Sequence, residues 1–161
     1  SFSLIMKSKR IDSDTIKSEL TLIKRNQKKV VFTNGCFDII HAGHVRYLKH
    51  AKSLGDILII GINSDSSVSV LKGKNRPINC LEHRIEVLES ISHVDYIISY
   101  DSETPENLLK IIKPDLLVKG GDYKDLNMVV GKDFVESYGG KVHLLDYIDG
   151  ISTSIIIDKM S

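Results

Sequence analysis

The stretch VVFTNGCFDIIHAGH, residues 30–44, decides the fold class of this chain. Its β-branched, apolar start, Val30–Thr33, is typical of a buried strand, and a helical pattern follows over 43–53. His41 and His44 are three residues apart, so at the start of a helix their side chains share one face. A helix N-terminus offers unpaired N–H groups and the positive end of the helix dipole, which favour an anion such as phosphate. The stretch therefore predicts a strand–loop–helix unit suited to binding phosphate.

The same residues leave other roles open. A His-x-x-His pair can supply two zinc ligands, and Cys36 and Asp38 are near enough in sequence to complete such a site. A thiol mechanism with Cys36 as nucleophile and His41 as base is not favoured, because the neighbours of Cys36 are apolar and none is basic. We expect Cys36 to be a small buried residue. Asp38 either contacts a substrate or caps the following helix.

Beyond residue 44, short β-rich runs alternate with helical segments, which predicts a mostly parallel sheet with helices on both faces. We expect strands at Val30–Thr33, Ile57–Ile62, Tyr96–Ser99, Leu116–Val118 and Val142–Leu145, and helices at 13–26, 43–53, 81–91, 105–112, 128–138 and 152–160. Residues 1–12 are polar and unpatterned, so we expect a linker or a frayed end there. The chain is accordingly divided into a linker with one helix, 1–28, and a domain, 29–161.

Polar segments follow four of the five expected strands and should meet at the carboxyl edge of the sheet, where ligands bind in this fold class. They span residues 34–44, 63–65, 119–123 and 149–154. Asn63, Ser64 and Asp65 can bind a ribose or cap the next helix, and the two roles can coexist. The segment 119–123 holds two glycines that let the backbone approach a ring or a phosphate, although a plain loop is the competing reading. Three hydroxyls at 152–154 fit phosphate binding better than capping alone.

A basic segment, Lys72–Pro77, follows the second of these polar segments. Taken alone, it is a solvated loop. Beside a phosphate site it becomes a clamp, because Lys and Arg side chains neutralise transferring phosphates. We choose Lys72 and Arg76 as the residues of that clamp.

Composition narrows the classes of function. With 22 basic and 21 acidic residues, 6% aromatic residues and no Trp, the chain is not expected to bind nucleic acid. Cys36 and Cys80 are far apart in sequence, which argues against a disulfide framework and fits a reducing cytoplasm. No apolar run approaches the ~18 residues needed to span a bilayer. The chain begins without Met, so we expect either a processed product or a piece of a longer protein.

Five stretches of the chain resemble the HxGH nucleotidyltransferases, the cytidylyltransferase-like superfamily. Within it they are most similar to the adenylyltransferases of ADP-heptose synthesis. The matching stretches are TNGCFDIIHAGHVRYL (33–48), LGDILIIGINSD (54–65), LKGKNRPIN (71–79), DLLVKGGDY (115–123) and DGISTSII (149–156). The late hydroxyl motif in this family often reads Ser-Thr-Thr or Ser-Ser-Thr, and here a hydroxyl is kept at every position. The resemblance implies an α/β fold: a Rossmann-like three-layer domain over 29–161, with a five-stranded, mostly parallel sheet.

The resemblance also implies an activity. ATP and D-glycero-β-D-manno-heptose 1-phosphate would give ADP-heptose and pyrophosphate for the lipopolysaccharide core, with Mg²⁺ accompanying ATP. The enzyme would be a bacterial cytoplasmic homodimer, and it is open whether a heptose kinase domain is fused to it. The expected catalytic residues are His41, His44, Lys72 and Arg76. The expected nucleotide-binding residues are Thr33, Asn34, Gly35, Cys36, Phe37, Gly43, Asn63, Asp65, Lys119, Gly120, Asp122, Tyr123, Ser152, Thr153 and Ser154. Asp38 is the one residue expected to reach the sugar, and no protein side chain is assigned to a metal.

Other functions stay open at this point. The spacing of the motifs does not separate adenine from cytosine, so a cytidylyltransferase acting on glycerol 3-phosphate or a similar small alcohol phosphate is the first alternative. A nucleotide-binding sensor without catalysis is the second, and a zinc-dependent hydrolase is the third. The anomer of the sugar phosphate is not determined by the sequence.

Overall fold

The computed structural model describes residues 8–120, 128–145 and 153–160, and for residues 153–155 only the backbone. Five strands form one sheet in the order β3-β2-β1-β4-β5, and every neighbouring pair is parallel. The strands are β1 Val30–Gly35, β2 Ile57–Asn63, β3 Tyr96–Tyr100, β4 Leu116–Gly120 and β5 Lys141–Leu145. The strand order reverses between β1 and β4, so the fold has its switch point beside the histidine motif. The predicted five-stranded parallel sheet is confirmed.

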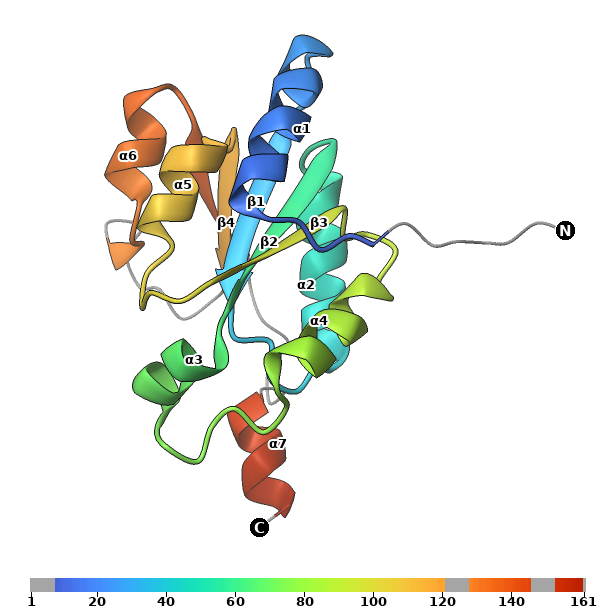
Figure 1. Ribbon diagram of the computed structural model, residues 1–161, viewed down its shortest axis with the longest axis vertical. Helices are drawn as coiled ribbons and strands as arrows, with labels where there is room; N and C mark the ends of the chain where they lie inside the picture. Colours follow the sequence, from blue (N-terminus) through green and yellow to red (C-terminus); the bar gives the residue numbers. More distant parts are fainter. Residues whose placement is uncertain (1–7, 121–127, 146–152, 161) are drawn as a thin grey trace, which may run out of the picture.

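Helices cover both faces of the sheet, as the alternation of β and α segments predicted. They are α1 Ser13–Arg25, α2 Ala42–Ser53, α3 Asp65–Lys72, α4 Leu81–Glu89, α5 Glu106–Ile112, α6 Lys132–Ser137 and α7 Thr153–Met160. Helices α1, α5 and α6 lie on one face, and α2 and α4 lie on the other (Figure 1). Each face of the sheet therefore has its own hydrophobic core, the first with α1, α5 and α6 and the second with α2 and α4. Alternate residues of β1 enter the two cores: Phe32 packs in the first and Val31 in the second. The domain is thus a three-layer α/β unit.

The N-terminal helix belongs to the same core as the sheet. Ile16, Leu20 and Ile23 are buried on the face of α1 that packs in the first core. Just before it, the backbone N–H of Ile11 donates to Ile97 of β3, and Ile97 donates to Lys9, both at 2.9 Å. The expected linker is therefore wrong from residue 8 onward, because backbone pairing with an edge strand needs no side-chain pattern. The proposed division at residue 28 does not separate two independent cores.

Two helices differ from the sequence-based expectation. Helix α3 was not among the expected helices, because its serine-rich sequence, DSSVSVLK, has little apolar periodicity and buries only Ser67 and Val68. Helix α6 begins at Lys132 instead of residue 128 and ends at Ser137. Among the described residues, no helix combines the length and the apolar character needed to cross a bilayer.

Candidate active site

The loop after β1 places the aromatic ring of Phe37 next to the histidine motif. Phe37 has a positive φ of 49° and is 6% exposed, and its ring centroid lies 5.5 Å from that of His44. The ring also lies directly on Gly35: a Cβ built there would be 3.1 Å from Cε2 of Phe37. A side chain at position 35 would therefore force the ring of Phe37 to move by a few tenths of an ångström. Phe37 packs beside the ring of His44 and, being buried, offers little of its own surface to a ligand.

The two histidines are locked in one orientation by the start of α2. His41 is the N-cap, and its Nδ1 accepts the backbone N–H of Gly43 at 3.1 Å. Nδ1 of His44 accepts the backbone N–H of His41 at 3.3 Å, and the ring centroids are 4.0 Å apart. Because both Nδ1 atoms accept, the remaining proton of each neutral ring is assigned to Nε2. The site thus holds two adjacent Nε2–H donors at a helix N-terminus.

Both rings are kept neutral. Burial lowers the pKa of His41, and burial together with the neighbouring His41 lowers the pKa of His44 to about 4. A neutral imidazole donates one hydrogen bond from Nε2 without carrying a proton that must be removed. The predicted pairing of His41 and His44 on one face is confirmed.

Basic side chains gather around the end of β1. Burial raises the pKa of the Cys36 thiol, while the positive charges of Lys72, Arg84 and Arg76 act in the opposite direction. Those three cations therefore lie close enough to Cys36 for their charges to be felt there. The thiol stays protonated at neutral pH, which agrees with the expectation that Cys36 is not a nucleophile.

Asp38 holds the basic segment in place. The residue is buried, with 3% of its surface exposed. Its carboxylate accepts the backbone N–H groups of Ile78 and Asn79 and the Nε–H of Arg76, each at 2.8 Å. Burial alone would raise the pKa of this carboxyl, but these donors outweigh it and lower the pKa. The capping role considered for Asp38 is wrong, since His41 occupies the N-cap of α2. The sugar contact stays a prediction for a carboxylate that is already engaged.

Arg84, which is not among the residues predicted for the site, is the largest fully buried side chain of the described residues, at 1% exposed. Nε donates to the carbonyl of Asn79 at 3.0 Å, and Nη1 donates to the carbonyls of Cys36 and Asn63 at 2.7 and 2.8 Å. Nη2 forms an ion pair with Asp65 at 2.8 Å. One guanidinium therefore joins the loops after β1 and β2 to the segment before α4.

A hydrogen-bond chain crosses the carboxyl edge of the sheet. Nζ of Lys119 donates to Oδ1 of Asn34 at 2.7 Å, and Nδ2 of Asn34 donates to the hydroxyl of Tyr100 at 3.0 Å. Tyr100 in turn donates to Oδ1 of Asn63 at 3.0 Å. Burial lowers the pKa of Lys119 to about 8, although the Cys36 thiolate would raise it. These hydrogen bonds connect residues of β4, β1, β3 and β2, so the ends of the four strands form one polar unit.

Comparison with known proteins gives this edge a family. The sequence profile of the cytidylyltransferase-like family matches residues 32–159. The chain belongs to the cytidylyltransferase-like family. The match begins within β1 and reaches into α7, and it contains every residue described in this site.

Several curated relatives of this cytidylyltransferase-like chain are named Bifunctional protein HldE. The one from Hahella chejuensis is 54% identical over 147 residues, which are 91% of this chain and 31% of the relative. The one from Campylobacter jejuni subsp. jejuni serotype O:6 is 50% identical over an alignment of 164 positions that covers 99% of this chain and 34% of the relative. The chain thus spans about a third of the length of these relatives.

Two solved structures share the fold. The lipopolysaccharide core biosynthesis protein from Thermoplasma volcanium superposes with a TM-score of 0.60 at 26% identity, covering 75% of this chain and 97% of that one. Pantoate-beta-alanine ligase from Francisella tularensis has a TM-score of 0.58 at 19% identity, covering 87% of this chain and 67% of that one. The second likeness concerns the fold alone.

Within the cytidylyltransferase-like domain, some predicted nucleotide-binding residues are used inside the protein. Thr33 is 1% exposed and its hydroxyl lies 2.7 Å from that of Tyr47. Asn63 is 2% exposed, and its amide donates to Ser67 and to the carbonyl of Ser102. The capping role expected within residues 63–65 is confirmed for Ser64, which is the N-cap of α3. A nucleotide contact from Thr33 or Asn63 stays a prediction, and it would have to come from the backbone atoms of these buried residues.

Other predicted residues of the cytidylyltransferase-like domain are only partly covered by the structure. Asp122, Tyr123 and Ser152 lie outside the described residues, and Thr153 and Ser154 are described only as the helical backbone that begins α7. Among the described residues, no group of three or more His, Cys, Asp or Glu side chains is placed to hold a metal ion. Cys36, considered as a zinc ligand, faces Oδ1 of Asn63 instead.

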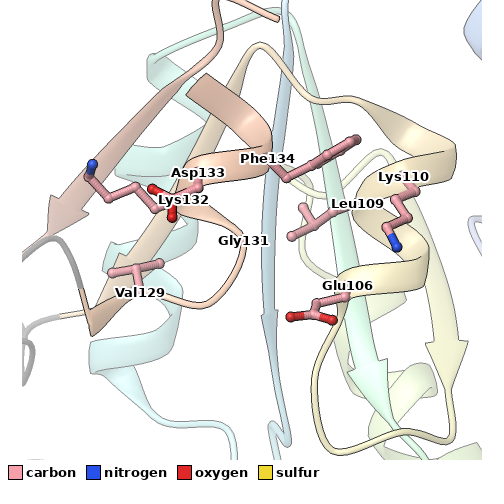
Figure 2. Close-up of a pocket in the computed structure, with 8 residues that line it drawn as sticks. All are labelled: Glu106, Leu109, Lys110, Val129, Gly131, Lys132, Asp133 and Phe134. Carbon is pink, nitrogen blue, oxygen red and sulfur yellow. The ribbon is translucent and has the colours of Figure 1, made fainter. Parts of the chain in front are cut away.

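A separate pocket of about 210 Å³ opens between α5 and α6 (Figure 2). Its apolar lining includes Leu109, Val129 and Phe134, and charged side chains of both signs stand around it. None of the residues predicted for the cytidylyltransferase-like site lines this pocket.

Proposed function

We propose that this chain is an adenylyltransferase that joins ATP and D-glycero-β-D-manno-heptose 1-phosphate into ADP-heptose, with release of pyrophosphate. The observation that carries the proposal is the pair of neutral, Nε2–H-donating histidines at the N-terminus of α2, beside a group of cations. Support for the choice of ATP and the sugar comes from the sequence motifs that resemble ADP-heptose adenylyltransferases. The similarity to HldE proteins and to a lipopolysaccharide core biosynthesis protein points in the same direction.

The reaction needs positioning and charge stabilisation more than acid–base chemistry. A phosphate oxygen of the sugar 1-phosphate attacks the α-phosphorus of ATP, and the bond from that phosphorus to the oxygen bridging to the β-phosphorus breaks. The nucleophile is already anionic near neutral pH, so no strong general base is required. His41 and His44 would donate to the α- and β-phosphates as negative charge builds, together with the N–H groups that begin α2. Lys72 and Arg76 would hold the departing pyrophosphate.

Mg²⁺ is proposed as the ion that accompanies ATP. Among the described residues, no group of three or more acidic, His or Cys side chains is placed to hold the ion. Oxygens of the triphosphate would be its main ligands, as is common for Mg²⁺ in nucleotide sites. When bound, the ion neutralises part of the triphosphate charge. The neutral histidines suit this arrangement. They donate hydrogen bonds to the phosphate oxygens and add no further positive charge that would repel the ion.

The setting of the enzyme is proposed on coarser grounds. The curated relatives are bacterial and named as bifunctional proteins, and this chain matches about a third of each. This fits a domain fused to a heptose kinase and acting in the bacterial cytoplasm, where ATP is available. Both cysteines, Cys36 and Cys80, are free, which fits a reducing compartment. A homodimer is expected from the family resemblance.

A cytidylyltransferase acting on glycerol 3-phosphate is the second candidate, favoured by the family to which residues 32–159 belong. The test measures pyrophosphate release with Mg²⁺, pairing ATP or CTP with heptose 1-phosphate or glycerol 3-phosphate. Release with only ATP and the heptose supports the proposal, and running both anomers of the heptose phosphate assigns the substrate form. Release with only CTP and glycerol 3-phosphate would transfer the mechanism to the second candidate. ATP binding without any pyrophosphate release would favour a nucleotide-binding sensor.

A further inference from the structure

Among the described residues, the guanidinium of Arg76 is held through one of its three nitrogens. Its Nε donates to Oδ2 of Asp38 at 2.8 Å, with side-chain exposures of 14% for Arg76 and 1% for Asp38. Among the described residues, neither Nη1 nor Nη2 of Arg76 donates to a protein acceptor. Arg84 offers the contrast, because its Nε, Nη1 and Nη2 all donate to protein oxygens. The protein thus engages all three guanidinium nitrogens of Arg84, whereas the Nη1–Nη2 end of Arg76 has no protein acceptor among the described residues.

Asp38 is itself a fixed support. Its carboxylate accepts the backbone N–H groups of Ile78 and Asn79, and the side-chain amide of Asn79 donates to the carbonyl of Asp38 at 2.7 Å. The carbonyl of Arg76 accepts the hydroxyl of Ser69, and its N–H donates to Gly73. Both the carboxylate and the backbone that carries Arg76 are thus anchored independently of the guanidinium. The contact at Nε consequently sets the plane in which the guanidinium lies.

That plane matters for an anionic ligand. A guanidinium recognises a phosphate best when two of its N–H groups point at two oxygens, and a fixed orientation reduces the entropy lost on binding. With Nε occupied, the edge formed by Nη1 and Nη2 is the edge left for a phosphate. The bond to Asp38, two residues after Cys36, places this guanidinium beside the loop that follows β1.

We propose that Asp38 is a positioning residue that aims the Nη1–Nη2 edge of Arg76 at a phosphate of the bound nucleotide or of the departing pyrophosphate. This inference rests on the proposed function and deepens it, since it gives Asp38 a role other than sugar binding. It requires that Arg76 keep Asp38 when a phosphate binds, instead of exchanging one partner for the other.

The first experiment is chemical rescue in the full chain. Arg76→Ala should lower kcat for pyrophosphate release by about 10²–10³, as expected for the loss of one preorganised donor. Free guanidinium, at concentrations far below those that unfold proteins, should restore at least about tenfold of that loss, because Asp38 still offers a carboxylate to hold it. In Asp38→Asn/Arg76→Ala the rescue should disappear. Equal rescue in both backgrounds would overturn the positioning role.

Matched controls separate positioning from folding. Asp95 makes a similar pair of contacts, since it accepts Nζ of Lys52 and the backbone N–H of Leu58. It lies at the amino ends of the strands, away from the candidate site. Asp95→Asn/Arg76→Ala should therefore keep the rescue seen with Arg76→Ala. Asp38→Glu, which retains the charge and moves the carboxylate by one methylene, replaces Asp38→Asn if the latter fails to fold. Rescue that survives in Asp38→Glu at full strength would contradict a requirement for this geometry.

A second measurement uses the unmodified protein and does not depend on turnover. With ¹⁵N-labelled arginine, the Nε–H signal of Arg76 should stay hydrogen-bonded when inorganic pyrophosphate is added, while its Nη groups become resolved through slowed rotation. Release of the Nε–H by pyrophosphate would show that Arg76 exchanges partners, and the inference would fail. If no pair of substrates releases pyrophosphate, the proposed adenylyltransferase is wrong, but this spectrum still decides the role of Asp38.

Discussion

His44 accepts the backbone N–H of His41 through Nδ1 at 3.3 Å, so the second histidine of the motif caps the helix on which it stands. His41 does the same for Gly43 at 3.1 Å. One set of contacts therefore completes the N-terminus of α2 and leaves both Nε2–H groups directed away from the backbone. The spacing of the motif serves the helix end and the ligand at the same time, which couples local stability to the chemistry of the site.

Replacement of His44 by alanine should reduce pyrophosphate release by about 10²–10³, because one preorganised donor to the phosphates is lost. The loss of the cap should lower the free energy of unfolding by about 1 kcal/mol, so the variant should remain folded. Steady-state kinetics and thermal unfolding measure the two effects. His50→Ala, an exposed position on the same helix, is the control and should change neither. Activity retained within tenfold of the unmodified protein would remove His44 from the mechanism.

The protonation of His44 makes a separate prediction. Its pKa of about 4 lies below the ordinary value of 6.5, because the buried ring resists charging. As pH falls from about 6.5 to about 4, the unfolded chain takes up a proton that the folded one does not. The free energy of unfolding should therefore fall over this window, by up to about 3 kcal/mol from this residue. His44→Gln should flatten that part of the profile.

NMR titration checks the same point at the level of the ring. The signals of His44 should stay those of the neutral Nε2–H tautomer from pH 8 down to about pH 5. A midpoint near 6.5 would mean that the ring is solvated and that the Nδ1 contacts do not hold in solution.

The strand ends could be read from the sequence, and the long-range polar contacts could not. Runs such as Val30–Thr33 are unambiguous because a strand buried on both faces is continuously apolar. Arg84 was missed because its partners Cys36 and Asn63 are 48 and 21 residues away. A signal did exist: Arg84 stands on the apolar stripe of α4, on the buried side with Ile85 and Leu88. A charged residue on such a stripe needs buried partners, and only the fold determines which ones.

Arg84 should therefore be more important for stability than for binding. Arg84→Met removes the hydrogen bonds to the carbonyls of three residues, Asn79, Cys36 and Asn63, while the half-exposed Asp65 can turn to solvent. Losing this donor to three carbonyls should lower the free energy of unfolding by about 3–5 kcal/mol. Arg84→Lys should recover only part of this, because one ammonium cannot reach loops on three sides. Chemical denaturation measures the change. Arg46→Met, at an exposed position of α2, is the matched control and should lie within about 0.5 kcal/mol of the unmodified protein. A loss as small for Arg84→Met would contradict the network.

Lys119 should show the opposite balance between stability and binding. Its pKa is lowered from 10.5 to about 8 by burial, so at pH 7 the folded protein carries an ammonium at a cost that the unfolded chain does not have. Between pH 8 and about 10.5 the folded form releases its proton first, and stability should rise with pH. Lys119→Met should consequently raise the free energy of unfolding at pH 7 by about 1–2 kcal/mol, after allowance for the lost hydrogen bond to Asn34.

The same variant should bind ATP more weakly, because the ammonium at the switch point between β1 and β4 attracts the anionic ligand. In the unmodified protein ATP affinity should fall between pH 7 and 9 as Lys119 loses its charge, and in Lys119→Met this pH dependence should be absent. Calorimetric titration at both pH values measures it, with Lys141→Met, exposed at the start of β5, as the control. A Lys119→Met protein that is less stable at pH 7 yet binds ATP normally would show that the lysine serves the fold. A more stable protein with weakened binding would show that the buried charge is kept for the ligand.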